Sequence, residues 1–235
     1  MKVLAVDSSS VTASVAILDG EKVVADFYLN AGLTHSQTLA PMVDLAVKNS
    51  GFKLSDLDFF AVTSGPGSFT GLRIGVATVK GLAVGCGKKC VGISSLLAAA
   101  WNCKDFEGIV CACMDARRSE VYSALFRASG GKLERLTADR AISLQDLKKE
   151  LKNFNFKVKL VGDGAKMCYN SLLEGEKDKF ELSSEISRYV NAKMVALASL
   201  DGYCEEKLLQ PEDLNLQYLR LSQAERMILS KNNLK

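Results

Sequence analysis

The stretch at residues 64–75, SGPGSFTGLRIG, constrains the fold more than any other part of the chain. It follows an apolar run at 59–63 that is typical of a buried strand, and it leads into an apolar run at 72–84 that is typical of a mostly buried helix. Glycine-rich turns between a strand and a helix are common in α/β proteins, where the helix N-terminus offers unpaired N–H groups to an anion. The first expectation is therefore a phosphate-binding turn.

The spacing of the glycines does not fit the two best-known phosphate-binding turns. Gly65, Gly67 and Gly71 form a G-x-G-x-x-x-G pattern, which is one residue longer than the dinucleotide fingerprint. A P-loop would require a lysine and a hydroxyl residue next, and Gly71 is followed by Leu72 and Arg73. The whole stretch is therefore more distinctive than any phosphate motif within it.

The composition limits the available chemistry. The 235 residues are 48% hydrophobic and 24% charged, and the net charge of +3 is too small to indicate nucleic-acid binding by the chain alone. The single histidine, His35, excludes motifs with two histidine ligands, so we expect no metal site and no metalloprotease. The seven cysteines are scattered and are expected to be reduced. Without a signal peptide or an 18-residue apolar run, a cytoplasmic protein with no membrane contact is expected.

The order of expected strands and helices repeats along the chain. A strand at 1–6 ends at Asp7 and the polar turn that starts with Ser8, and two further strands flank the hairpin turn Asp19-Gly20. Helices and strands then alternate, and a later strand that ends at Asp115 begins a similar series. We predict an α/β protein with the two-lobed fold of actin-like and sugar-kinase-like ATPases, built from a duplicated βββαβα unit.

This repetition sets the expected domains. We place an N-terminal lobe, with the helices that meet a partner or a second copy, at residues 1–104, and a C-terminal lobe at 105–210. The segment 211–235 is expected to pack back on the N-terminal lobe.

Three shorter expectations concern the second half of the chain. The polar segment 175–187 is expected to be a loop. Residues 191–209 are expected to form one long helix, and 223–231 a last short one.

The residues that end the repeated strands suggest a nucleotide cleft. In working ATPases of this architecture, the aspartate after the first strand helps to position metal and phosphate. Asp7 and Ser8 occupy that place here, and the second lobe contributes Asp115 and the turn with Gly162 and Gly164. The same residue types are also ordinary in turns, and the chain is short for such a kinase. A vestigial cleft and a stand-alone small ATPase or kinase are both open, and we favour the vestigial cleft.

Other polar residues give weaker signals. Ser68 and Thr70 have no base for nucleophilic catalysis except the distant His35, so no catalytic residue is predicted. Arg117 and Arg118 follow Asp115 and its strand, where they suit either a clamp for an anion or partner carboxylate, or a solvated turn with an internal Asp–Arg pair.

The expected first helix has one apolar face. Leu39, Met42, Val43 and Ala46 recur at i, i+3, i+4 and i+7. Pro41 lies inside this pattern, so the helix is expected to start late or to kink there.

The second helix carries glycines in two rows. Each interior glycine lowers helix stability by about 1 kcal/mol relative to alanine, so we expect the glycines to be required by close packing. Gly71 and Gly75 form one row, and Ala77, Gly81 and Gly85 form another. Rows of small residues let another backbone come close. Packing on the protein's own sheet explains one row, and the second row suggests a partner protein.

Motifs from most of the chain point to one family. They are VLAVDSS at the start, His35-Ser36 with Leu39 and Pro41-Met42, SGPGSFTGLRIG, DARRSEVY at 115–122, and LQYLR at 216–220. Together they resemble the bacterial TsaB (YeaZ) family, although Leu216 stands where the family pattern P-x-Y-L-R has proline.

The resemblance implies a non-catalytic subunit that binds TsaD, and TsaE through the complex. The complex transfers threonylcarbamoyl to the adenosine beside the anticodon in tRNAs that read codons beginning with A. ATP and metal then belong to the partner subunits, no cofactor is bound strongly by this chain, and tRNA is contacted indirectly. Alone, the chain is expected to be a homodimer through a similar surface. The partner surface is expected on the first two helices, at Leu39, Met42, Val43, Ala46, Gly71, Arg73, Ile74, Gly75, Ala77 and Gly81.

Overall fold

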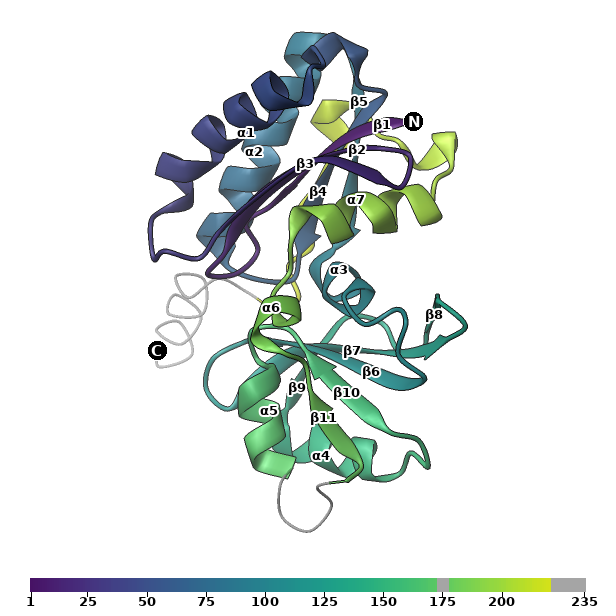
Figure 1. Cartoon of the computed structure of the whole chain (residues 1–235). Helices are drawn as coiled ribbons and strands as arrows, with labels where there is room; N and C mark the ends of the chain where they lie inside the picture. The colour runs from purple at the N-terminus through teal and green to yellow at the C-terminus, as the bar shows by residue number, and fades with distance from the viewer. Residues whose placement is uncertain (173–177, 221–235) are drawn as a thin grey trace, which may run out of the picture.

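A computed structural model describes residues 1–172 and 178–220. The chain forms two lobes, each built around one β-sheet, with helices on the outside and between the sheets (Figure 1). The helix predicted at 223–231, and the corresponding part of the segment 211–235, lie outside the described residues.

The first sheet has five strands in the order β3-β2-β1-β4-β5. β1 pairs antiparallel with β2 and parallel with β4. β2 and β3 form the predicted hairpin, but its two turn residues are Gly20 and Glu21, one position later than expected, because Asp19 pairs with Lys22. The strands are β1 (Lys2–Asp7), β2 (Ala13–Asp19), β3 (Lys22–Leu29), β4 (Phe59–Gly65) and β5 (Lys89–Ser94).

The second sheet repeats this arrangement in the order β11-β10-β6-β7-β8, with β9 also paired to β7. β6 pairs antiparallel with β7 and parallel with β10, as β1 does with β2 and β4. The predicted two-lobed α/β fold with a duplicated unit is thereby confirmed. The strands are β6 (Gly108–Asp115), β7 (Glu120–Ser129), β8 (Lys132–Arg135), β9 (Arg140–Ser143), β10 (Val158–Val161) and β11 (Phe180–Leu182).

Helices cover the sheets in layers. In Figure 1, α1 and α2 lie together on one side of the first sheet, α7 lies on its other side, and α4 and α5 belong to the second lobe. The helices are α1 (His35–Ser50), α2 (Phe69–Cys86), α3 (Ser95–Trp101), α4 (Leu144–Lys152), α5 (Ala165–Leu172), α6 (Glu185–Arg188) and α7 (Ala192–Asp201). Single 3-10 turns are η1 (Leu54–Asp56), η2 (Glu205–Lys207) and η3 (Pro211–Asp213).

One apolar core is shared by the two lobes. It contains Val3 and Ala5 of the first sheet, Val110 and Phe126 of the second, and residues of α3 and α7. Two further cores lie under α1 and α2 and under α4 and α5. Because apolar side chains of both sheets meet in the shared core, the lobes are joined by hydrophobic burial as well as by the chain connections.

Two predicted elements differ from the structure. The helix expected at 191–209 ends at Asp201, because the chain must leave it for Leu209 to pair with Cys90 beside β5. The loop expected at 175–187 contains β11 and α6. β11 has only three residues and exists through its pairing with β10, so no local sequence signal marks it.

The chain after α7 returns along the edge of the first sheet. Leu209 exchanges two backbone hydrogen bonds with Cys90 of β5, with N–O distances of 2.8 and 2.9 Å. Leu214 is buried with residues of α2 in the core of the first lobe. We call residues 209–220 the C-terminal strap. The strap covers an edge strand that would otherwise present unpaired backbone groups.

The turn before α2 packs directly on the turn after β1. The backbone N–H of Ser68 donates to the carbonyl oxygen of Ser9 at 2.7 Å, and the hydroxyl of Ser68 caps α2 by accepting from Gly71 N at 3.3 Å. A Cβ atom at Gly67 would collide with the carbonyl oxygen of Ser9. The glycines here are thus explained by close backbone contact.

The glycines of α2 should respond oppositely to alanine. A Cβ at Gly71 would overlap the carbonyl oxygen of Ser8, whereas a Cβ at Gly81 meets nothing within 4 Å. We expect Gly71→Ala to lower the unfolding free energy by about 1–3 kcal/mol. We expect Gly81→Ala to raise it by about 0.5–1 kcal/mol through helix propensity. Urea unfolding of both variants and the parent measures the difference, and equal effects would contradict the assigned packing.

Candidate functional site

Asp7 lies at the end of β1 and is fully buried. Its Oδ1 atom accepts hydrogen bonds from the Ser9 hydroxyl at 2.7 Å, the Thr63 hydroxyl at 2.8 Å and the Ser9 N–H at 3.1 Å. Its Oδ2 atom is buried without a partner. Burial raises the pKa of this carboxyl, and the bonds from Ser9 and Thr63 only partly oppose the shift. Asp7 therefore ties β1 to β4, and its carboxylate is closed to a nucleotide in this conformation.

Ser8 is also used within the protein. Its hydroxyl donates to the carbonyl oxygen of Gly71 at 2.9 Å, and a Cβ at Gly75 would collide with that hydroxyl. The polar turn, which would hold phosphate in a working ATPase of this architecture, instead holds the start of α2.

The second lobe repeats the contact between a strand end and a glycine turn. Cβ atoms at Gly162 and Gly164 would collide with the backbone of residues 113–115 at the end of β6. The N–H of Asp115 donates to the carboxylate of Asp163 at 3.2 Å. The structure therefore brings Asp115 and the two predicted glycines together, and the glycines are explained by packing.

The pKa of the Asp163 carboxyl is also raised. Burial raises its pKa from 3.8 to about 6, and the charges of Asp115 and Asp7 add to the increase while backbone hydrogen bonds oppose it.

The loop after β6 has an unusual backbone. Arg117, Arg118 and Ser119 have φ angles of 66°, 57° and 60°, a left-handed conformation that costs about 1–2 kcal/mol per residue outside glycine. The carboxylate of Asp115 accepts from the backbone N–H of Arg117 at 2.7 Å. Among the described residues, neither guanidinium forms an ion pair, so the internal Asp–Arg side-chain pair considered above is not formed.

His35 is partly buried at the start of α1. Its Nε2 atom lies 2.9 Å from the carbonyl oxygen of Ser10, and its Nδ1 atom is buried without a partner. In the part of the chain that the structure describes, no three His, Cys, Asp or Glu residues are grouped to hold a metal ion.

The apolar face of α1 belongs to the core. Leu39, Met42, Val43 and Ala46 are buried against the first sheet and α2, so their side chains do not line an outer surface. The i, i+3, i+4, i+7 pattern marks the side of an amphipathic helix that packs inward. The outward side of α1 instead exposes Leu45, at 46% of its area.

The two small-residue rows of α2 lie on different sides. Gly71 and Gly75 are buried against Ser8, so this row is used within the protein. The other row is open, because nothing lies within 4 Å of a Cβ at Gly81 or Gly85. We define the outer helix face by the exposed residues of both helices, Leu45, Arg73, Ala77, Gly81 and Val84, with Ile74 partly exposed at its edge.

α2 is also apolar over its whole length. The expectation that no 18-residue apolar run exists was wrong: within the described ranges, α2 is the one helix long and apolar enough to cross a membrane by length and composition. Its inner side packs on β4 and α1, and its outer side carries Val84 at 67% exposure. Its apolar character is therefore divided between the core and the outer helix face.

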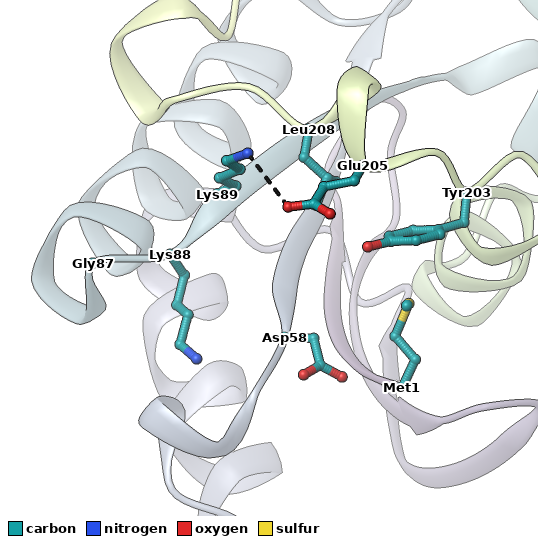
Figure 2. A pocket seen from close by; sticks show the side chains of 8 residues that line it. All are labelled: Met1, Asp58, Gly87, Lys88, Lys89, Tyr203, Glu205 and Leu208. Atoms are coloured by element: carbon teal, nitrogen blue, oxygen red, sulfur yellow. Dashed lines mark ion pairs between the residues drawn. The ribbon is translucent and has the colours of Figure 1, made fainter.

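A separate hollow of about 470 Å³ shares no lining residue with the predicted sites (Figure 2). Its wall contains an ion pair between Lys89 and Glu205 at 4.0 Å. Its lining carries two lysines and two carboxylates, so it favours no single ligand charge. The lining residues are Met1, Asp58, Gly87, Lys88, Lys89, Tyr203, Glu205 and Leu208.

Sequence reasoning missed an aromatic contact beside α2. The rings of Phe69 and Tyr218 stack with centroids 4.1 Å apart, and the Nε of Arg73 donates to the Tyr218 hydroxyl at 3.0 Å. Tyr218 belongs to the LQYLR segment, which was the available signal, but nothing local indicated that this segment lies beside α2.

Comparisons with known proteins agree with this geometry. The family model described as tRNA N6-adenosine threonylcarbamoyltransferase, TsaD, matches residues 30–210. The tRNA threonylcarbamoyladenosine biosynthesis protein TsaB of Bacillus subtilis is 30% identical over 225 residues, which cover 96% of each chain.

Solved structures show the same fold. YeaZ from Pseudomonas aeruginosa superposes with a TM-score of 0.78 at 23% identity, covering 93% of this chain and 99% of that one. Component A of (R)-2-hydroxyglutaryl-CoA dehydratase from Acidaminococcus fermentans has a TM-score of 0.50 at 14% identity, covering 86% and 98%. The two-lobed fold is thus that of actin-like ATPases, as predicted.

The raised pKa of Asp163 predicts that ionisation of this carboxyl lowers the free energy of unfolding. The folded-state pKa of about 6 exceeds the ordinary value of 3.8, so the unfolded chain releases this proton first and stability falls as pH rises from about 4 to 6. Asp163→Asn keeps an acceptor for Asp115 N–H and removes the buried charge. We expect it to raise the unfolding free energy at pH 7 by about 1–3 kcal/mol, with no gain below about pH 4. Urea unfolding across pH 4–8 tests this, with Asp44→Asn as an exposed control; a gain independent of pH would refute it.

Proposed function

Since this chain belongs to the TsaB (YeaZ) family and so to tRNA threonylcarbamoyladenosine biosynthesis, we propose that it is the non-catalytic subunit that binds TsaD. TsaE joins through the complex, which transfers threonylcarbamoyl to the adenosine beside the anticodon in tRNAs that read codons beginning with A. The chain then acts as a scaffold and activator of an acyltransferase, with no catalysis of its own.

One observation carries this proposal. The outer helix face combines small residues with exposed apolar ones, and its glycines cost helix stability without any internal packing that requires them. Ala77 and Gly81 let a partner helix approach closely, and Leu45 and Val84 supply apolar area. This surface suits a helical partner, and we assign it to TsaD.

The same face explains the other partners that we propose. A surface that buries apolar area against TsaD would also favour self-association, so the chain alone is a homodimer through it.

We propose that ATP and metal are bound by the partner subunits, that this chain binds no cofactor strongly, and that the complex is cytoplasmic.

The alternative, a stand-alone ATPase or kinase, is less well supported. It would need the carboxylate of Asp7 to reach metal or phosphate, whereas Asp7 has no exposed surface and Ser8 is bonded to α2. The chain also has a single histidine, so the proposed metal chemistry requires another subunit.

Gly81→Leu tests the proposed surface without disturbing the fold. Because a Cβ at Gly81 meets nothing within 4 Å and the residue is exposed, the variant should keep thermal stability near that of the parent and obstruct only close docking. We expect affinity for TsaD of the same source to fall by about 10- to 100-fold, which corresponds to 1–3 kcal/mol of overpacking. Titration calorimetry and co-purification measure the loss.

Ala141→Leu is the matched control, because Ala141 is an exposed small residue on β9 of the other lobe. It should bind TsaD like the parent. If Gly81→Leu also binds TsaD with parental affinity, the interface lies elsewhere.

A further inference from the structure

We propose that a second surface, where the strap crosses between the lobes, binds tRNA directly. We call it the junction surface and define it by Phe69, Arg73, Arg117, Arg118 and Tyr218. The ligand is the phosphate backbone and an unstacked base of RNA. This inference depends on the chain's role in tRNA modification. The junction surface shares Arg73 with the outer helix face, so its test changes other residues.

The aromatic part of the junction surface is already arranged for stacking. Phe69 and Tyr218 are nearly parallel, with an interplanar angle of 9°, and 41% of Tyr218 is exposed. The guanidinium carbon of Arg73 lies 4.6 Å from the Phe69 ring centroid and 5.9 Å from that of Tyr218. An exposed aromatic ring fixed beside an arginine is the usual platform for a nucleobase.

The cationic part consists of Arg117 and Arg118. Both side chains are exposed, and neither has an ion pair or a side-chain hydrogen bond within the described chain. The left-handed loop that carries them is held by Asp115, which accepts from Arg117 N–H, and by a bond of 3.1 Å from Ala116 N to Glu120 O. Backbone strain that the surroundings maintain is often found at binding sites.

The strap brings the two parts together. Gln217 N–H donates to Ser64 O at 2.8 Å on the first lobe, and Arg220 donates to Ala116 O at 2.8 Å on the second. Arg220 also forms an ion pair with Glu120, which removes that carboxylate from competition with a phosphate.

The strap spans a short distance between its contacts with the two lobes. One residue, Leu219, separates Tyr218 from Arg220, so their Cα atoms lie at most about 7 Å apart. A small hollow of about 10 Å³ beside them is lined by Pro66, Gly67, Phe69, Leu72, Tyr122, Gln217, Tyr218, Leu219 and Arg220.

RNA fits these residues better than an acidic protein does. Two unpaired arginines would suit either, but the exposed stack of Tyr218 on Phe69 adds a site for a base that an acidic peptide would not need. With a net charge of only +3, and with Asp115 beside the arginines, few phosphates can be bound. The interaction is therefore expected to be weak and sensitive to salt.

The test measures binding of the full chain alone to an unmodified tRNA transcript that reads a codon beginning with A, by fluorescence anisotropy. We expect Arg117→Ala/Arg118→Ala to weaken binding by about 10- to 100-fold at about 50 mM salt, and to reduce the slope of log K against log salt by about 1.5. The control Lys22→Ala/Lys132→Ala removes two exposed lysines at hairpins of the two lobes and should change binding much less.

Tyr218 separates stacking from charge. Tyr218→Phe keeps the ring and should bind tRNA like the parent, whereas Tyr218→Leu should weaken binding by about 5- to 100-fold with little change in salt slope. Thermal unfolding of both variants identifies any loss of binding that comes from misfolding. If Tyr218→Leu fails to fold, Tyr218→Phe still tests whether the aromatic ring without its hydroxyl is sufficient for tRNA binding.

Several results would overturn the inference. They are absence of tRNA binding by the chain, equal losses in the arginine and lysine double variants, or normal tRNA binding but lost TsaD binding in Arg117→Ala/Arg118→Ala. The last result would assign the arginines to an acidic protein surface. Because Gly81→Leu should keep tRNA binding while losing TsaD, failure of one proposal can be distinguished from failure of the other.

Discussion

Glycine turns press directly against the backbone at the end of the leading strand in both lobes. Gly67, in the turn before α2, meets the carbonyl of Ser9 just after β1, and Gly162 meets that of Cys113 in β6. A side chain at either glycine would separate the turn from the strand, so the position of α2 and of the turn before α5 depends on these contacts. The duplicated unit is thus held by the same interaction twice.

The same contacts determine whether Asp7 and Ser8 are available to bind a nucleotide. Where an ATPase would present a carboxylate and a polar turn, Asp7 is sealed by hydroxyls and Ser8 is bonded to α2. Burial makes the negative charge of Asp7, and of Asp163 across the lobes, unfavourable. The fold is that of actin-like ATPases, but in this chain internal contacts occupy the positions that would bind phosphate. What remains available for function is the outer surface, since function depends on the site and not on the fold.

Those surfaces meet at the N-terminal end of α2. Arg73 is exposed on the outer helix face and also contacts Tyr218 of the strap. The strap in turn spans the lobes, from Leu209 on the edge of the first sheet to Arg220 beside the loop after β6. A partner on the helices and a ligand at the junction would therefore lie close together, and a rigid shared core would keep their relative position constant.

The sequence alone determined the fold class, because strand and helix periods and the Asp19-Gly20 hairpin signal act within a few residues. Longer motifs such as SGPGSFTGLRIG and DARRSEVY indicated the family by resemblance. It also indicated that one small-residue row of α2 needed an external reason. Only the tertiary structure decided which row that was. A Cβ at Gly75 would meet Ser8, which is distant in the chain, whereas a Cβ at Gly81 would meet nothing within 4 Å. For the same reason the pairing of β11 and the stacking of Tyr218 on Phe69 had no local signal. The spacing of Leu39, Met42, Val43 and Ala46 did mark one side of a helix, and packing decided that this side faces the core. Periodicity reveals an apolar face, but only packing determines whether it is buried by the protein or left for a partner.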